Sequence, residues 1–277
     1  MTIFLILIGI YLVFTNIDRI PWVPFGKSED SVKVTDRIDK IEIDITSIKT
    51  EVIPDKRNDV KAVLQGKGEV IVSKSGDTIL VEYERGLFHW SPFNRRSNLT
   101  IYVPEDFDQD MNLRVGSGHI ELTESPMKLD ELSVEVHSGN VKLQQLTVQE
   151  FELDIASGNA TIKGLSANEG DIDVRSGNAT IEDYTGKLLA DVSSGRLKAE
   201  ITKLTDSISA DVNSGLLDLD LPDDADFTLT GKKSSGFISN DFTLKNIEKS
   251  GNTISGIHGD GTHPIELKVS SGKIDIR

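Results

Sequence analysis

The segments VEVHSGNVKL (134–143), LDIASGNATI (153–162) and IDVRSGNATI (172–181) are three versions of one pattern. In each, a Ser-Gly pair stands between two runs of alternating apolar and polar residues. The pair recurs at steps of 21, 19, 19, 18 and 20 residues, with glycines at Gly118, Gly139, Gly158, Gly177, Gly195 and Gly215. Two further pairs contain Gly236 and Gly272. A period near 20 residues is typical of repeat architectures.

Apolar residues occupy fixed positions when the copies are aligned on the glycine. They stand five and three residues before it, and two and four residues after it, with polar residues between them. The position five before the glycine, for example, holds Leu113, Val134, Leu153, Ile172, Ala190 and Ala210. This two-residue period predicts a strand with one buried face on each side of a Ser-Gly corner.

One such coil cannot bury its apolar face alone, whereas coils stacked about 4.8 Å apart bury it continuously and pair their backbones. We therefore predict an all-β fold, a β-solenoid of the single-stranded β-helix type with coils of about 20 residues. Glycine suits the corner because it tolerates positive φ or close packing between coils. An antiparallel β-sandwich is the alternative, since it also uses short strands at regular spacing. The alignment of the columns favours the solenoid.

The chain before the repeat contains alternating strands without Ser-Gly pairs, and we expect it to cap one end of the solenoid, because an uncapped end exposes backbone and apolar side chains. The predicted organisation is a hydrophobic anchor helix in residues 1–20, a linker in 21–37, an N-terminal β cap in 38–110 and the Ser-Gly solenoid in 111–277.

The anchor prediction rests on the apolar run IFLILIGIYLVF at residues 3–14. No Lys or Arg precedes this run and no small-residue cleavage site follows it, while Trp22 suits a membrane interface. These features favour an uncleaved anchor or signal-anchor; a cleaved signal peptide and a soluble segment remain alternatives. We expect a single-pass protein of the cell membrane with its acidic C-terminal bulk outside the cytoplasm.

Composition excludes several classes of function. A net charge of -15 argues against nonspecific nucleic-acid binding. The chain has no cysteine, which excludes disulfides, thiolate metal sites, cysteine nucleophiles and an acylated lipoprotein cysteine.

Three features together resemble a known family: the strand IEIDITSIKTEVIP (41–54), the strand LTIYVPED (99–106) and the serial Ser-Gly-Asn units. They are similar to the bacterial putative-adhesin domain of unknown function, which also forms the extracytoplasmic part of LiaG-like membrane-anchored proteins. The resemblance covers residues 38–277 and the N-terminal anchor. It implies a role at the cell envelope linked to stress responses, and it brings no catalytic residues with it.

A column of carboxylates stands four residues before successive glycines: Glu135, Asp154, Asp173, Asp191 and Asp211. Unit charges about 4.8 Å apart repel by about 1 kcal/mol even in bulk water. The column is therefore either a solvated face or a ladder that recruits calcium or magnesium between coils. No defined calcium-binding loop is present, and no specific metal site or cofactor is predicted.

An asparagine follows the glycine in three successive coils, as Asn140, Asn159 and Asn178. Stacked amides at this spacing can hydrogen-bond along the solenoid axis, so we interpret the column as structural.

The loop ERGLFHWSPFNRR (84–96) concentrates aromatic and basic residues in an acidic chain. Binding surfaces are enriched in these types, and the candidate residues are Arg85, Phe88, His89, Trp90, Phe93, Arg95 and Arg96. The loop is either a recognition tip or an aromatic plug for the end of the solenoid.

No nucleophile elbow or phosphate-binding loop is visible, and we assign no catalytic residue. We predict a non-catalytic binding, scaffolding or sensing accessory of the bacterial envelope, with an envelope protein or cell-wall component as partner. The alternative is a polysaccharide-active enzyme, a β-helical lyase or hydrolase that uses the carboxylates of one face.

Overall fold

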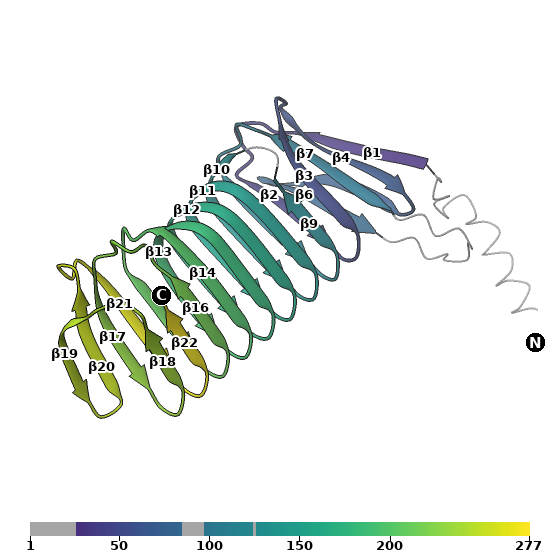
Figure 1. Ribbon diagram of the computed structural model, residues 1–277. Coiled ribbons are helices and arrows are strands. Elements are labelled where there is room, and N and C mark those ends of the chain that lie inside the picture. The colour runs from purple at the N-terminus through teal and green to yellow at the C-terminus, as the bar shows by residue number, and fades with distance from the viewer. Residues whose placement is uncertain (1–25, 85–96, 124–125) are drawn as a thin grey trace, which may run out of the picture.

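The computed structural model describes residues 26–84, 97–123 and 126–277, and the regular elements in these ranges are β-strands stacked into one long body (Figure 1). At the N-terminal end lie β1 (Gly26–Lys33), β2 (Lys40–Ile45), β3 (Lys49–Asp55), β4 (Asp59–Gly66), β5 (Glu69–Ser75), β6 (Thr78–Glu84) and β7 (Asn98–Pro104). The middle contains β8 (Asp110–Val115), β9 (His119–Leu122), β10 (Met127–Val136), β11 (Asn140–Ile155), β12 (Asn159–Val174), β13 (Asn178–Val192), β14 (Arg196–Lys203), β15 (Ile208–Val212) and β16 (Leu216–Asp220). At the C-terminal end lie β17 (Phe227–Lys233), β18 (Phe237–Asn240), β19 (Lys245–Ser250), β20 (Thr253–His258), β21 (His263–Val269) and β22 (Lys273–Ile276).

Each coil has two arms joined at the Ser-Gly corner, and each arm pairs in parallel with the same arm of the next coil. β11 and β12, for example, pair from Asn140↔Asn159 to Ile155↔Val174, which is one repeat of 19 residues. The alternating apolar positions on both arms are buried and form one continuous core. The predicted all-β solenoid is confirmed, and the antiparallel sandwich is excluded.

Close packing, and not positive φ, requires the corner glycines. A Cβ atom on Gly158 would lie 2.5 Å from the carbonyl oxygen of Gly139 and 2.5 Å from Cγ1 of Val136 in the coil below. The same clash with the preceding corner recurs along the row, and none of these corner glycines has a positive φ. Backbone hydrogen bonds set the approach, as when the amide of Asn159 donates to Gly139 at 3.0 Å.

A second bend lies six residues after the glycine in three coils. Gln145, Gly164 and Asp183 occupy it with φ values of 57°, 71° and 57°. Two of the three are not glycine, although this left-handed region disfavours other residues. The bend turns each long strand towards the next face of the coil.

Coils at both ends are stacked out of chain order. The coil formed by β21 and β22 lies between β15–β16 and β17–β18, because β21 pairs with both β15 and β17, and β22 with both β16 and β18. At the other end, the coil of β2 and β3 lies between β6–β7 and β8–β9. The Ser-Gly pair of Gly272 therefore precedes that of Gly236 in space.

The N-terminal section differs in detail from the cap and linker that the sequence suggests. β2 and β3 form a true coil whose corner is Thr46-Ser47-Ile48, and Thr46 and Ile48 accept hydrogen bonds from Ser117 and His119. Residues 26–33, placed in the linker by their polarity, form β1 and pair antiparallel with β4. Antiparallel strands close both ends of the stack, with β1, β4 and β5 at one end and β19 and β20 at the other.

Across the residues that the structure describes, no helix has the length and hydrophobicity needed to cross a membrane. The predicted anchor helix in residues 1–20 lies outside the described residues.

Asp226 holds the loop that leads from β20 into the inserted coil. Its Oδ1 accepts the amides of Asp260 at 2.7 Å, of Gly261, and of Thr262 at 3.2 Å, and its Oδ2 accepts the Thr262 hydroxyl at 2.6 Å. These hydrogen bonds, led by that of the Thr262 hydroxyl, lower the pKa of Asp226 to about 2.

We expect Gly158→Ala to destabilise the protein by about 1–3 kcal/mol, because the new methyl group must push two coils apart. Urea unfolding measures the change. Ser157→Ala at the exposed neighbouring position is the control and should stay within about 0.5 kcal/mol of wild type. Equal stability of the two variants would show that the corner does not depend on this contact.

The hydrogen bonds that Asp226 accepts predict that the free energy of unfolding depends on pH. The folded pKa of about 2 lies below the ordinary value of 3.8, so the ionised carboxylate stabilises the fold above about pH 4, and this contribution is lost as the pH falls towards 2. Asp226→Asn should therefore lower the urea midpoint at pH 7, and its difference from wild type should shrink between pH 4 and 2.

Asp224→Asn changes an exposed carboxylate in the same turn and serves as the control for the loss of charge. A similar loss of stability in both variants at pH 7 would contradict a specific role for Asp226.

Candidate binding surfaces

The five carboxylates predicted as a column do lie in one row. The strand register places Glu135 beside Asp154, then Asp173, Asp191 and Asp211 in successive coils. A cation ends the row on each side. Arg114 lies beside Glu135 in the register, and its Nε is 3.6 Å from Oε2 of Glu135.

At the far end, Lys268 follows Asp211. It arrives there only because the coil of β21 and β22 is inserted out of chain order. The repeat period alone therefore could not reveal this second cation.

Two neighbouring rows widen the column into a face. They lie six and eight residues before the glycines, where Glu152 aligns with Asp171, and Glu131 with Glu150 and Glu169. We call the combined set the acidic face. Its members, all at least partly exposed, are Glu131, Glu135, Glu150, Glu152, Asp154, Glu169, Asp171, Asp173, Asp191 and Asp211.

Crowding on this face perturbs its carboxylates. Partial burial raises the pKa of Asp191, and the charges of Asp211 and Asp173 raise it further. Burial likewise raises the pKa of Asp171, with added repulsion from Glu152. At both residues burial is the larger cause, and repulsion between neighbouring carboxylates adds to it.

Two cations offset part of the repulsion. Arg175 Nη2 lies 2.5 Å from Oδ2 of Asp154, and Lys187 Nζ lies 2.6 Å from Oε2 of Glu169. Ten carboxylates against these two cations, together with Arg114 and Lys268 at the ends of the column, leave the face negative.

The arrangement is a flat array and not a chelating site. Within the described ranges, no three Asp, Glu or His side chains converge on a point that could hold a metal ion. Neighbouring carboxylates lie side by side along the stack, so the face can present regularly spaced negative charge to a partner. The proposed cation ladder between coils stays a prediction.

The asparagine column forms the predicted ladder. Nδ2 of Asn159 donates to Oδ1 of Asn140, and Nδ2 of Asn178 donates to Oδ1 of Asn159, both at 3.0 Å. Each amide thus continues the backbone hydrogen bonding of the corner, which confirms its structural role.

The aromatic and basic loop residues Arg85, Phe88, His89, Trp90, Phe93, Arg95 and Arg96 lie outside the described residues. The strands on either side of them are informative. β6 pairs with β2 and β7 pairs with β3, so β6 and β7 are the two arms of one coil. Both interpretations of this loop, as a recognition tip or as an end plug, stay predictions.

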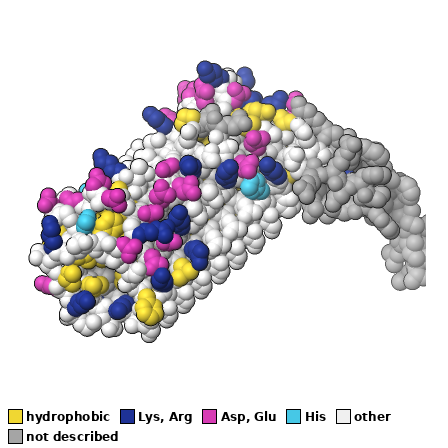
Figure 2. Space-filling model, viewed as in Figure 1, with side chains coloured by type: hydrophobic (Ala, Val, Ile, Leu, Met, Phe, Trp, Pro, Cys, Tyr) yellow, Lys and Arg dark blue, Asp and Glu magenta, His cyan; other side chains and the backbone are white. Residues whose placement is uncertain are grey.

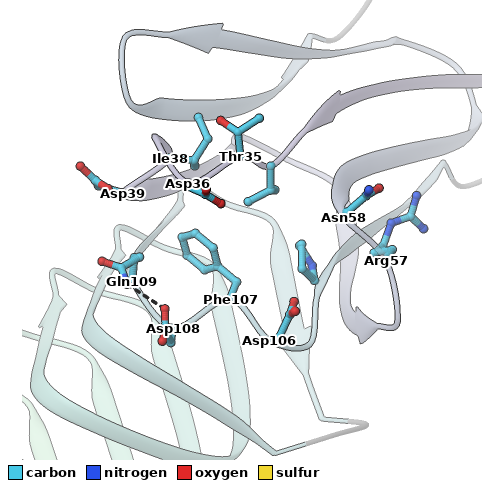
Figure 3. Close-up of a pocket in the computed structure, with 12 residues that line it drawn as sticks. Thr35, Asp36, Ile38, Asp39, Arg57, Asn58, Asp106, Phe107, Asp108 and Gln109 are labelled. Carbon is cyan, nitrogen blue, oxygen red and sulfur yellow. Dashed lines mark hydrogen bonds between the residues drawn. The ribbon is translucent and has the colours of Figure 1, made fainter.

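A hollow of about 360 Å³ lies near the N-terminal end, where three connecting segments meet (Figure 3). Phe107 and Ile38 are buried in its wall. Four carboxylates surround it together with Arg57: Asp36, Asp39, Asp106 and Asp108. Sequence reasoning missed this hollow, although the acidic turn PEDFDQD (104–110) around a single aromatic residue was a visible signal.

Arg57 in this hollow is held from several sides. Its Nη2 lies 2.8 Å from Oδ1 of Asp59 and its Nη1 lies 3.8 Å from Oδ2 of Asp55. The guanidinium carbon stands 5.3 Å from the centre of the Tyr102 ring. Because these partners already occupy Arg57, the hollow is better suited to a cationic group than to an anion.

We expect Asp191→Asn to raise the melting temperature at pH 7. The raised pKa means that the folded state disfavours the ionised form, so the destabilising charge is fully present above the folded pKa and absent below the ordinary value of 3.8. The gain should accordingly vanish near pH 3.

Asp206→Asn is a control that should change the melting temperature in the opposite direction. Hydrogen bonds from the Ser207 amide and hydroxyl lower the pKa of Asp206, so its removal should lower the melting temperature at pH 7. Thermal unfolding at the two pH values measures both effects. A loss of stability in Asp191→Asn at pH 7 would overturn the account of repulsion.

Comparison with known proteins agrees with this architecture. A "putative adhesin" from Bacteroides fragilis has 17% identity and a TM-score of 0.54, with 92% of this chain and 98% of that chain covered. A "putative lipid binding protein" from Parabacteroides distasonis has 13% identity and a TM-score of 0.50, with 92% and 98% covered. At these identities the likeness establishes the fold alone. No match is found among curated proteins. The model of the family Toastrack DUF4097 matches residues 38–277, so the resemblance seen in the sequence is confirmed and the chain belongs to the Toastrack DUF4097 family.

Proposed function

We propose that this chain is a non-catalytic binding and scaffolding module of the bacterial cell envelope, with the acidic face as its contact surface. The observation that carries the proposal is the fixed register of ten carboxylates over one parallel sheet. Backbone pairing holds this pattern of charge rigidly, so a partner meets a preformed surface and does not have to order it on binding.

The geometry of the face supports binding over catalysis. Hydrolysis of a glycosidic bond requires two carboxyl groups that flank the scissile bond from opposite sides, about 5 to 9.5 Å apart. The carboxylates of the acidic face instead project side by side from exposed strands. The enzyme alternative, a polysaccharide lyase or hydrolase, would need a different grouping of residues.

Charge restricts the class of partner. An acidic surface is repelled by anionic lipid or anionic wall polymer within a Debye length of about 8 Å, unless divalent cations bridge the two. We therefore favour a basic surface of an envelope protein, with a cation-bridged contact to a cell-wall component as the second arrangement. In this proposal residues 1–20 anchor the chain in the cell membrane and the solenoid lies outside the cytoplasm. The adhesin name of the Bacteroides fragilis relative supports an exposed location.

The test is a capture experiment from envelope material with the full-length chain as bait. A variant that carries Asp154→Asn, Asp173→Asn and Asp191→Asn neutralises the centre of the face without changing side-chain shape. The control carries Glu200→Gln, Asp223→Asn and Asp224→Asn, which alters net charge equally at positions off the face. We expect the face variant to capture about 90% less partner than wild type, because charges at the centre of an interface contribute most to binding. The control variant should capture as much partner as wild type.

Two further arms separate the alternatives. Chelation of divalent cations should leave capture intact if the partner is a basic protein and abolish it if cations bridge the contact. A Trp90→Ala, Arg95→Ala, Arg96→Ala variant tests the loop as a recognition tip. Equal capture by the face variant and the wild type would overturn the acidic face as the contact surface.

A further inference from the structure

β18 is exceptional among the arms of the coils. Every other coil arm that the structure describes pairs with a strand on both sides, whereas β18 pairs only with β22. The amide of Phe237 donates to the carbonyl oxygen of Gly272, just before β22, at 3.1 Å, and the amide of Asp241 donates to that of Ile276 in β22 at 3.0 Å. Because backbone groups alternate along a strand, those of Ile238 and Asn240 point to the opposite edge. No described strand lies along that edge.

Other edge strands of the molecule carry the usual protection against pairing. β1 (GKSEDSVK) and β19 (KNIEKS) are rich in charged residues. On β5, the amide of Val72 is already bonded to Oδ2 of Asp30 at 2.8 Å. β18 (FISN) has no charged residue, and natural sheets use charge at their edges to prevent association. Its edge is thus left available.

An exposed aromatic side chain accompanies this open edge. Phe237 is 68% exposed, the highest value among the large hydrophobic residues of the described chain. The register aligns it with Lys273 and then with Leu216, which is also exposed. On the inner side, Ile238 is only partly buried against the core. A strand added beside β18 would cover both sides of it.

Exposed lysines lie near this open edge, in a part of the chain that is only weakly charged. Residues 222–277 contain seven basic and eight acidic side chains, a net charge of -1 in a chain whose total is -15. Lys232, Lys233 and Lys249 are exposed and have no ion pair among the described residues. Figure 2 shows hydrophobic and Lys or Arg side chains next to one another over the C-terminal end, at the lower left of the view.

We propose that the free edge of β18 binds an extended, acidic strand of a partner protein by β-strand addition. The partner's backbone pairs with Ile238 and Asn240, an apolar side chain packs beside Phe237, and flanking carboxylates meet Lys232 and Lys233. An acidic strand is favoured over a second copy of β18, because β18 itself has no carboxylate that could meet Lys232 and Lys233. This site is separate from the acidic face and does not depend on it.

The probes are synthetic peptides of about eight residues with alternating Val and Thr, a length within the usual range of roughly 3–10 residues for a strand. One carries Asp and Glu at its ends, one carries Lys, and one is the acidic peptide with a central proline that cannot donate to a ladder. Fluorescence anisotropy with the full-length chain measures affinity. We expect the acidic peptide to bind about tenfold more tightly than either of the others.

Variants of the chain locate the site. Asn240→Pro removes the outward amide without touching the bonds to β22, and it should abolish binding, whereas Asn240→Ala keeps the amide and should bind as wild type. Phe237→Ala should weaken binding about tenfold, as loss of an aromatic anchor does. Circular dichroism with thermal unfolding verifies that each variant is folded.

Four outcomes would overturn the proposal. These are no saturable binding of the acidic peptide, equal binding of the proline-interrupted peptide, binding that survives in a folded Asn240→Pro variant, and self-association of the wild-type chain that Asn240→Pro abolishes. The last would assign the edge to a second copy.

Discussion

The contact between each corner glycine and the carbonyl oxygen of the corner below is the constraint on which this molecule depends. At Gly158 a Cβ atom would stand 2.5 Å from the Gly139 oxygen, so the coils approach as closely as backbone atoms allow. This closeness lets the amide of Asn159 reach the same oxygen at 3.0 Å. Strand register follows, because a corner that must sit directly on the preceding corner leaves the arms no freedom to slide.

Because the register is fixed, side chains that repeat in the sequence form continuous rows on the surface. Because the register places Asp154 beside Asp173, residues at the same position of successive repeats form one row on the surface. The residue type at that position therefore determines the chemistry of the whole row. The row of asparagines adds hydrogen bonds along the axis. In the row of carboxylates, burial and then the charges of Asp211 and Asp173 raise the pKa of Asp191. A row of like charges lowers the stability of the fold, and burial of the core offsets this loss. Such a row is therefore better explained by a function than by a contribution to stability.

The sequence allowed the repetitive part of the structure to be predicted, because coils that follow one another in the chain also pair with one another. It could not reveal where that rule fails. The insertion of β21 and β22 depends on long-range pairing that has no period, and so does the position of Lys268 beside Asp211. The left-handed bends at Gln145 and Asp183 could not be located from the sequence either, because no glycine marks them. The open edge of β18 could not be predicted for the same reason, because an open edge depends on which strands pair in the fold and has no signal in the sequence period.

The out-of-order coils also show how a stack of this kind closes its ends. If β21 and β22 were stacked in chain order, they would form an outermost coil that pairs on one side only. Here β22 is instead held between β16 and β18, and the backbone of Arg277 bonds to Leu219 and Leu221 at 3.0 and 2.7 Å. The guanidinium lies 3.5 Å from carboxylate oxygens of both Asp218 and Asp220. On this side of the coil the outermost position passes to β18, which the chain joins to β17 before it and to β19 after it. Pairing with β22 and both chain connections hold β18 in place, and this favours the preformed edge that a docking strand requires.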